Sequence, residues 1–198
     1  KGHRNRVFWV HNKTVRIAEN QPELGAPDES AHQWKEWDKP MLLVCTHGIR
    51  DRCCGTLGGM VFAKLYRRRP EWVWQCSHLG GHRFAPTILN LPDGMLYGRV
   101  PLENCEALLN CTENGQRWDT LYQRGDTALS KPLQVLSIEL SKDPRTYSLD
   151  KVEYIEPHQV AVTVQRGAQQ TSYLIKYHSI GLVQASCDDS VKKEVGSW

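Results

Sequence analysis

Two short stretches of the sequence contain the residues whose types and spacing could bind a metal. The first, CTHGIRDRCC, begins at Cys45 and ends at Cys54, nine positions further on. The second, CSHLGGH, holds His78 and His82 four positions apart with two glycines between them. Thiolate and neutral imidazole are both metal ligands, and a glycine-containing turn can aim two imidazole rings at one point. Neither stretch has enough ligands alone, so the fold has to bring the two together.

Spacing alone leaves the chemistry of these residues open. Cys45 ends an apolar run, and cysteine is among the residue types most often buried without any further role. The two histidines could equally satisfy backbone carbonyl groups of their own loop. A metal site and a structural role are therefore both compatible with the pattern.

The elements that must position the two stretches can be predicted from the residues around them. The apolar run MLLVCT predicts a buried strand that ends at Cys45, and the helical spacing of LGGMVFAKLYRRR predicts a helix that Pro70 ends. The turn residues Pro-Asp-Gly within TILNLPDGMLYGRV predict a hairpin. The expected order is strand 41–46, helix 57–69, strand 71–77, hairpin 87–100 and helix 101–111.

The rest of the chain predicts two flanking regions and an α+β or α/β fold class. Residues 1–40 combine a strand at 6–12 with an acidic, Pro-rich linker from 18 to 40, and we expect them to belong to a longer N-terminal region because the chain starts with Lys rather than Met. The central unit, which contains both stretches, is expected at 41–114. Residues 115–198 predict a helix at 130–142 followed by a small antiparallel sheet, because the later segments alternate apolar and polar residues.

Composition narrows the classes of function. The 25 basic and 22 acidic side chains leave a formal charge of +3, which is too small an excess to indicate a nucleic-acid partner. No apolar run approaches the roughly 18 residues that a membrane span needs. The chain has seven cysteines, an odd number at irregular spacing, which favours a reducing compartment with cysteines used for metal or redox work. We therefore expect a cytoplasmic protein.

The two stretches also carry a resemblance to a known family. CTHGIRDRCCG together with CSHLGGHRFAPTILNLPDGMLYGRV closely resembles the sucrase/ferredoxin-like family, and residues 41–111 resemble a thioredoxin-like 2Fe-2S ferredoxin. LYQRGDTALSKPLQVLSIEL and the late ASC are similar to the C-terminal region of that family. The resemblance implies that Cys45 and Cys54 bind one iron of a 2Fe-2S cluster and that His78 and His82 bind the other.

Cys53 competes with Cys54 for the role of second cysteine ligand. We prefer Cys54 because the nine-residue spacing from Cys45 matches the family pattern, and because Cys54 leads directly into Gly55 and the helix, whose N-terminus suits the charge of a cluster. His47 is expected to form hydrogen bonds in the loop rather than to bind metal.

The remaining cysteines and charged neighbours are assigned more ordinary roles. Cys76 is expected in the core beneath the site. Packing is the simplest role for Cys105, Cys111 and Cys187. The charged residues around the proposed ligands could donate hydrogen bonds to cluster sulfides, attract an acidic redox partner, or simply be solvated; they are Arg50, Asp51, Arg52 and Arg83.

The predicted function is an electron carrier rather than an enzyme. A 2Fe-2S cluster with two neutral histidine ligands would transfer one electron to or from a redox partner protein, with reduction coupled to proton uptake on an imidazole. One alternative is a structural Cys2His2 zinc module. Another is a thiol oxidoreductase that uses Cys53 or Cys54, although the sequence lacks Cys-x-x-Cys. Glycoside hydrolysis, which the word sucrase suggests, needs two facing carboxylates, and no such pair stands out near the site.

Overall fold

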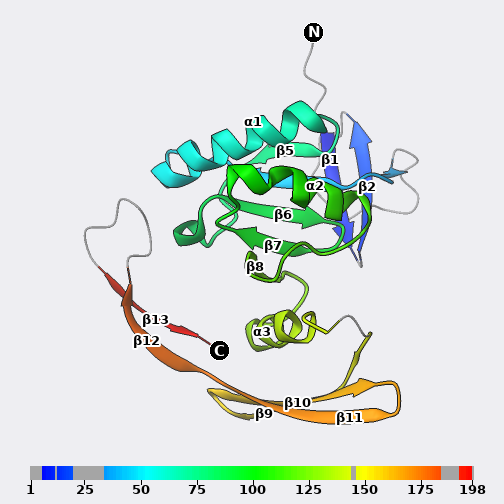
Figure 1. The fold of residues 1–198 in the computed structure, drawn as a ribbon, viewed down its shortest axis with the longest axis vertical. Coiled ribbons are helices and arrows are strands. Elements are labelled where there is room, and N and C mark those ends of the chain that lie inside the picture. Colours follow the sequence, from blue (N-terminus) through cyan, green and yellow to red (C-terminus); the bar gives the residue numbers. More distant parts are fainter. Residues whose placement is uncertain (1–5, 12, 20–33, 144–145, 184–191, 198) are drawn as a thin grey trace.

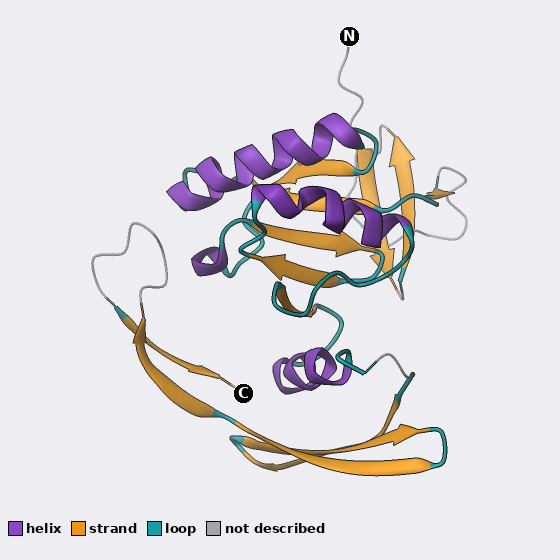
Figure 2. Cartoon of the chain, viewed as in Figure 1, coloured by secondary structure: helices purple, strands orange, loops and turns teal. Residues whose placement is uncertain are grey.

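The computed structural model describes residues 6–11, 13–19, 34–143, 146–183 and 192–197 of the chain. These residues form a mixed α/β fold with several sheets and three short α-helices (Figure 1, Figure 2). The α-helices are α1 (Gly59–Arg68), α2 (Cys105–Glu113) and α3 (Lys131–Leu140). Among the described residues, no helix is both long and apolar enough to cross a membrane.

A five-stranded sheet positions both stretches that could bind a metal. Its strands, in spatial order, are β5 (Val73–Cys76), β4 (Met41–Cys45), β6 (Thr87–Leu91), β7 (Met95–Gly98) and β8 (Gln123–Asp126). β4 and β5 run parallel, whereas the other neighbouring pairs are antiparallel. Because the pair is parallel, the C-terminal ends of β4 and β5 lie at the same end of the sheet. The first stretch begins at the last residue of β4 and the second at the last residue of β5.

The two faces of this sheet are covered by different elements because side chains alternate along a strand. Leu42 and Val44 of β4 belong to a core that includes Val61 and Leu65 of α1 and residues of α2. The two helices contact each other over this face (Figure 1). Leu43, on the other side of β4, packs against a smaller core that contains residues of the N-terminal hairpin.

The N-terminal hairpin consists of β1 (Arg6–His11) and β2 (Thr14–Glu19), with the short strand β3 (Lys35–Glu36) beside β2. Three aromatic rings join it to the sheet, since Phe8 contacts both Trp37 and Trp74 with ring centroids 5.6 and 5.2 Å apart. The predicted strand at 6–12 is confirmed as β1, but β2 was not predicted. Residues 20–33 of the expected linker lie outside the described residues.

The C-terminal region contains a second sheet made of β9 (Ser148–Glu156), β10 (Gln159–Arg166) and β11 (Gln169–Lys176). Leu136 and Leu140 of α3 pack on Val160, Val162 and other residues of this sheet. The predicted helix and small antiparallel sheet are therefore both confirmed. A further pair, β12 (His178–Val183) with β13 (Lys193–Ser197), was not predicted.

The predicted order of strand, helix, strand, hairpin and helix is confirmed, with two differences. The helix expected at 57–69 is preceded by a π-helical turn, η1 (Cys54–Gly58), that runs into α1. The helix expected at 101–111 starts with the 3-10 turn η3 (Leu102–Asn104) before α2. β8 follows residue 114, where the predicted ferredoxin unit ends, and pairs with β7 in the same sheet.

Candidate metal centre

Cys45 lies at the C-terminal end of β4 and is fully buried. Its neighbour in the sheet is Cys76, the last residue of β5. The apolar run before Cys45 explains this position, because Leu42 and Val44 hold the strand in the core under α1. Two thiols thus stand side by side at one edge of the sheet, as the parallel pairing requires.

Asp51 fixes the start of the helix that carries Cys54. Its carboxylate accepts hydrogen bonds from the backbone N–H groups of Cys53, at 2.9 Å, and Cys54, at 3.3 Å. The backbone N–H of Gly55 donates to the carbonyl of Asp51, at 3.2 Å. An acidic side chain that accepts from the first N–H groups of a helix acts as an N-terminal cap. Asp51 is itself buried, so this interaction is shielded from solvent.

Three glycines let the loop between Cys45 and Cys54 close tightly. A Cβ on Gly55 would lie 2.6 Å from the Cα of Gly48, on the facing side of the loop. A Cβ on Gly58 would lie 2.0 Å from the carbonyl oxygen of Cys45. Only glycine allows the π-helical turn to approach the strand end this closely, and the result is that Cys54 is buried near Cys45.

A glycine turn also positions the two histidines. Gly80 and Gly81 have φ of 83° and 62°, a left-handed conformation that glycine adopts without strain. This turn leads into the 3-10 turn η2 (His82–Phe84). The Nδ1 of His82 lies 3.3 Å from the Nε2 of His78, and the ring centroids are 5.1 Å apart.

The structure brings three of the four sequence-predicted ligands together directly. The ligand atoms of Cys45, Cys54 and His78 all lie within 4.8 Å of one another. His82 adjoins this group through His78. Two nitrogen ligands about 2.0–2.1 Å from one tetrahedral metal are about 3.3–3.4 Å apart, so the separation of the two imidazoles suits a shared metal. An N–H···N hydrogen bond between neutral rings has a similar length.

The protonation of these groups reflects burial. Burial, with a second contribution from the neighbouring Cys45, raises the pKa of the Cys54 thiol to about 12. The pKa of Cys76 is also raised to about 12, first by burial and then by Cys45. Burial lowers the pKa of His78, as does the nearby His82. Neutral imidazole is the ligand form, whereas thiols in this environment need a bound cation to become thiolates.

The other candidate residues are placed less favourably for binding at the same point. Cys53 is disulfide-bonded. The Nδ1 of His47 is buried without a hydrogen-bond partner, as is the Nδ1 of His78. Cys105 is buried in the core under α2, and Cys111 packs against that core, so the packing role expected for both is confirmed.

Two further expectations concern residues around the site. Cys76 adjoins the site, because it pairs with Cys45, but it is half-buried and does not belong to the core in which it was expected. Cys187 lies outside the described residues. Sequence reasoning missed the capping role of Asp51, which lies three positions before the observed start of η1 but six positions before the predicted helix start at residue 57.

Comparison with known proteins now bears on this site. The sucrase/ferredoxin-like family model matches residues 6–125, a range that contains all four proposed ligands. The chain belongs to the sucrase/ferredoxin-like family. The match also includes β8, so the whole five-stranded sheet lies in the family region apart from the last residue of that strand.

The sucrase/ferredoxin-like region is also similar to yeast proteins. Altered inheritance of mitochondria protein 32 of Saccharomyces cerevisiae is 30% identical over 105 residues, which cover 46% of this chain and 32% of the yeast protein. The protein of the same name in Saccharomyces kudriavzevii is 31% identical over 97 residues, which cover 42% of this chain and 31% of that protein. The matched part thus spans about a third of these relatives. No solved structure matches. Neither the family description nor these names specify an enzymatic activity.

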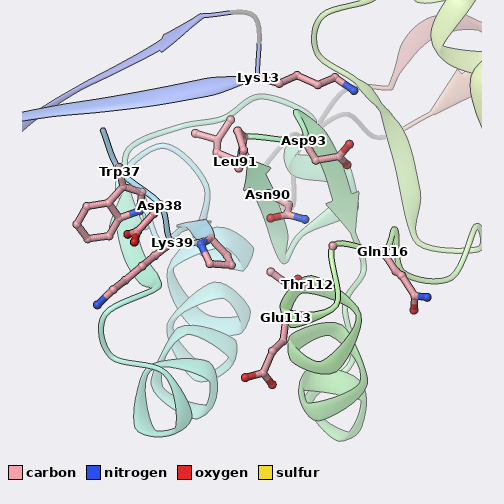
Figure 3. Close-up of a pocket in the computed structure, with 13 residues that line it drawn as sticks. Lys13, Trp37, Asp38, Lys39, Asn90, Leu91, Asp93, Thr112, Glu113 and Gln116 are labelled. Carbon is pink, nitrogen blue, oxygen red and sulfur yellow. The ribbon is translucent and has the colours of Figure 1, made fainter. Parts of the chain in front are cut away.

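This sucrase/ferredoxin-like chain also has a recess of about 440 Å³ at the opposite end of the sheet, shown in Figure 3. Its lining includes Asn90 and Leu91 from the end of β6, which pair with the start of β4 rather than with Cys45. Two of its carboxylates are occupied in ion pairs, because Asp93 binds Arg117 and Glu113 binds Arg69. The recess is therefore separate from the candidate metal centre.

Proposed function

We propose that this protein is an electron carrier that holds a 2Fe-2S cluster, with Cys45 and Cys54 on one iron and His78 and His82 on the other. The observation that carries the proposal is the convergence of Cys45, Cys54 and His78 within 4.8 Å, with His82 adjoining them. The family, whose description includes ferredoxin, supports a redox role. The donor set of two thiols and two neutral imidazoles fits such a cluster.

We also propose a thioredoxin-like arrangement for the domain that carries the site. The parallel pair β4 and β5 joined by α1, followed by the antiparallel hairpin β6 and β7 and then α2, supports this reading. The site then lies where the first strand leads into the first helix, and the helix N-terminus faces the proposed ligands.

When bound, the cluster supplies reversible one-electron transfer. The chain contributes two neutral ligands in place of two anionic ones, which favours acceptance of an electron and raises the reduction potential. Each imidazole keeps a second nitrogen that can hold a proton, so we expect proton uptake to accompany reduction. A redox protein is the proposed partner.

The compartment is also a proposal. Five of the six cysteines in the described part of the chain are free, which suits a reducing compartment such as the cytoplasm, whereas the disulfide bond of Cys53 does not. The name of the yeast relatives refers to mitochondria, and it describes those proteins rather than the compartment of this chain.

A pair of adjacent cysteines provides the test. Cys54→Ser should abolish iron binding, because Cys54 is buried beside Cys45, whereas Cys53→Ser should retain it. The measurement is iron and acid-labile sulfide per chain in each purified variant. A Cys54→Ser protein with full iron content beside an iron-free Cys53→Ser protein contradicts the assignment.

A single zinc ion is the second candidate, and the compactness of the site favours it. Zinc–sulfur bonds of about 2.3 Å place two thiolates of one tetrahedral ion about 3.8 Å apart, which is compatible with ligand atoms within 4.8 Å. Zinc would give a structural site without redox activity. Metal analysis separates the candidates, because zinc has no visible absorption and needs no sulfide.

A thiol oxidoreductase has less support. Such activity depends on a thiolate, and thiolates form readily only where the pKa is lowered. Burial instead raises the pKa of Cys54 to about 12.

A further inference from the structure

Three arginines from different elements surround the ring of Phe84, at the end of the 3-10 turn that begins with His82. The guanidinium carbons of Arg83, Arg99 and Arg124 lie 4.6, 5.4 and 4.8 Å from the centre of the ring. Each distance is short enough for an attraction between the cation and the aromatic face. One phenyl ring thus gathers three positive charges next to a proposed metal ligand.

These three arginines differ from Arg68, Arg69, Arg117 and Arg166 because they form no ion pair with any of the described residues. Within the described ranges, no carboxylate lies within ion-pair distance of Arg83, Arg99 or Arg124. Several arginines elsewhere do have acidic partners; examples are Arg68 with Glu106, Arg69 with Glu113, Arg117 with Asp93 and Arg166 with Asp143. The positive charge around Phe84 is therefore not neutralised by any described carboxylate, and an external anionic group could bind there.

The backbone holds the arginines in place. The guanidinium of Arg124 donates to the carbonyls of Leu121, Gln123 and Gly98, while its Nε is buried without a partner. The backbone N–H of Arg99 donates to the carbonyl of Phe84, at 2.7 Å. Burial lowers the pKa of Arg124, and the charge of Arg99 lowers it further. The guanidinium of Arg124 and the backbone of Arg99 are thus held beside Phe84 although the two like charges repel.

Close packing also builds the group into the fold. A Cβ on Gly98 would lie 2.8 Å from the Cβ of Phe84 and 3.0 Å from the Nε of Arg124. Gly98 therefore permits the approach of β7 to both side chains. Since preorganised donors bind at a lower entropic cost than mobile ones, this arrangement suits recognition.

An apolar recess adjoins the three arginines. It has a volume of about 310 Å³, and its mostly apolar lining includes Leu57, Met60, Pro86 and Leu102 together with two charged residues, Arg99 and Glu103. Leu57 and Met60 are 38% and 45% exposed, so the recess presents apolar surface to solvent. Arg99 belongs both to this recess and to the arginine group, so the two features form one surface.

We propose that this arginine surface, made of Arg83, Arg99, Arg124 and the adjoining recess, docks an acidic segment of a partner protein. Carboxylates of the segment bind the guanidinium groups, and an apolar side chain of the segment enters the recess. The planar guanidinium group of arginine can bind a carboxylate through two hydrogen bonds. The recess can hold one apolar side chain, and such anchored side chains contribute much of the binding energy of interfaces. A free inorganic anion has no group for the recess, so a protein segment fits the surface better.

The identity of this partner as a redox protein rests on the proposed function, but the docking itself does not. Docking here would place the partner beside His82, since Phe84 and His82 belong to the same turn. Electrostatic attraction of this kind mainly accelerates encounter and fixes orientation. Fast encounter and a defined orientation are what a transient electron-transfer complex requires.

The probe for the test is a fluorescein-labelled peptide that contains a leucine flanked by glutamates, and its binding is measured by fluorescence anisotropy at low salt. The double variant Arg83→Gln/Arg99→Gln should weaken binding about tenfold or more, because two charge-assisted contacts are lost. Arg67→Gln/Arg68→Gln, on exposed positions of α1, is the matched control with the same change of charge and should bind nearly as wild type does. Equal weakening in the two doubles, or no binding by wild type, overturns the proposal.

Two further arms identify what is bound. A peptide with glutamine in place of leucine should bind more weakly than the original, because the recess is left empty. Inorganic phosphate should compete poorly at matched ionic strength. If leucine adds nothing and phosphate displaces the peptide efficiently, the surface is a simple anion site and the proposal is wrong.

The outcome can be separated from that of the proposed function. Peptide binding is measured on protein whose iron and zinc contents have been determined. Binding with the expected selectivity to iron-free protein supports the docking surface and counts against the electron carrier. An iron-containing protein without that selectivity supports the carrier and overturns the docking surface.

Discussion

The two ends of the five-stranded sheet use polar residues in different ways. At the end that includes Met95 and Asp126, charges are neutralised within the fold, because Arg117 binds both Asp93 and Asp126, at 2.9 and 2.6 Å. At the other end, where β4 finishes, Cys45 is buried beside Cys54 and an imidazole, and the arginines around Phe84 have no acidic partner within the described ranges.

This difference separates residues that stabilise the fold from residues that are available for binding. Buried polar groups normally satisfy one another, so ion pairs such as that of Arg117 are sufficiently explained by the fold. Thiols with raised pKa, and the buried imidazole nitrogen and the arginines that have no partner among the described residues, are not explained in that way. We therefore expect substitutions at the first end to change stability alone, and substitutions at the second to change metal content.

The largest loss of stability is expected from Arg117→Ala. This change leaves Asp93 and the nearly buried Asp126 facing each other without a cation, which should lower the free energy of unfolding by about 3 kcal/mol. Urea denaturation measures the change, and iron per chain should stay as in wild type. The exposed pair of Arg68 and Glu106 is the control, since Arg68→Ala should cost less than about 1 kcal/mol. A large loss of iron in Arg117→Ala would break the distinction between the two ends.

A smaller loss of stability, with a loss of metal, is expected from Gly58→Ala. The new Cβ would lie 2.0 Å from the carbonyl oxygen of Cys45, so the strand end and the helix must move apart. We expect a loss of about 2 kcal/mol and reduced iron content.

Gly59→Ala is the matched control for this change. A Cβ at Gly59 meets nothing within 4 Å, and alanine in a helix should stabilise by up to about 1 kcal/mol. Thermal unfolding and metal analysis of both variants give the comparison. If Gly58→Ala keeps full iron content, the close approach of η1 to β4 is not needed by the site.

The smallest effect is expected from Tyr97→Phe. The hydroxyl of Tyr97 accepts a hydrogen bond from the backbone N–H of Trp118, at 2.9 Å, and its loss should cost about 1 kcal/mol at neutral pH. Burial raises the pKa of Tyr97 from 10.0 to about 12, so the folded state favours the protonated phenol. The contribution of the protonated Tyr97 phenol to the free energy of unfolding is therefore fully present below pH 10 and is lost as the pH rises toward 12.

The alkaline decline in stability should consequently be shallower in Tyr97→Phe than in wild type. Urea denaturation at a series of pH values between 9 and 12 measures both slopes. Identical slopes contradict the burial argument for Tyr97.

Local patterns predicted the elements next to the site because each contains its own signal. The apolar run before Cys45 predicts a buried strand, and Pro92-Asp93-Gly94 predicts the turn between β6 and β7. The glycine pair between His78 and His82 predicted a compact turn, which the left-handed φ angles of Gly80 and Gly81 bear out.

Other features depend on tertiary contacts and could not be predicted in this way. β8 has the polar sequence QRGD, and side-chain contacts outside the strand hold it, including those of Gln123 with the Trp118 carbonyl and Asp126 with Arg117. The π-helical start of the helix at Cys54 depends on Asp51 and on close approach to β4.

The arginine surface was visible in the sequence only in part. Arg83 stood out because it follows His82 directly, whereas Arg99 and Arg124 are distant in sequence and meet only around Phe84. The pairing of β7 with β8 brings Arg99, which follows the last residue of β7, close to Arg124 of β8. Such a contact between distant residues depends on the sheet and cannot be predicted from a local pattern.

The most direct test of the central claim is the absorption spectrum of freshly purified protein, with iron, sulfide and zinc assays on the same sample. A 2Fe-2S cluster held by Cys45, Cys54, His78 and His82 predicts a red-brown protein with about two irons and two acid-labile sulfides per chain. A colourless protein with about one zinc per chain and no sulfide would contradict the account and favour the structural zinc site.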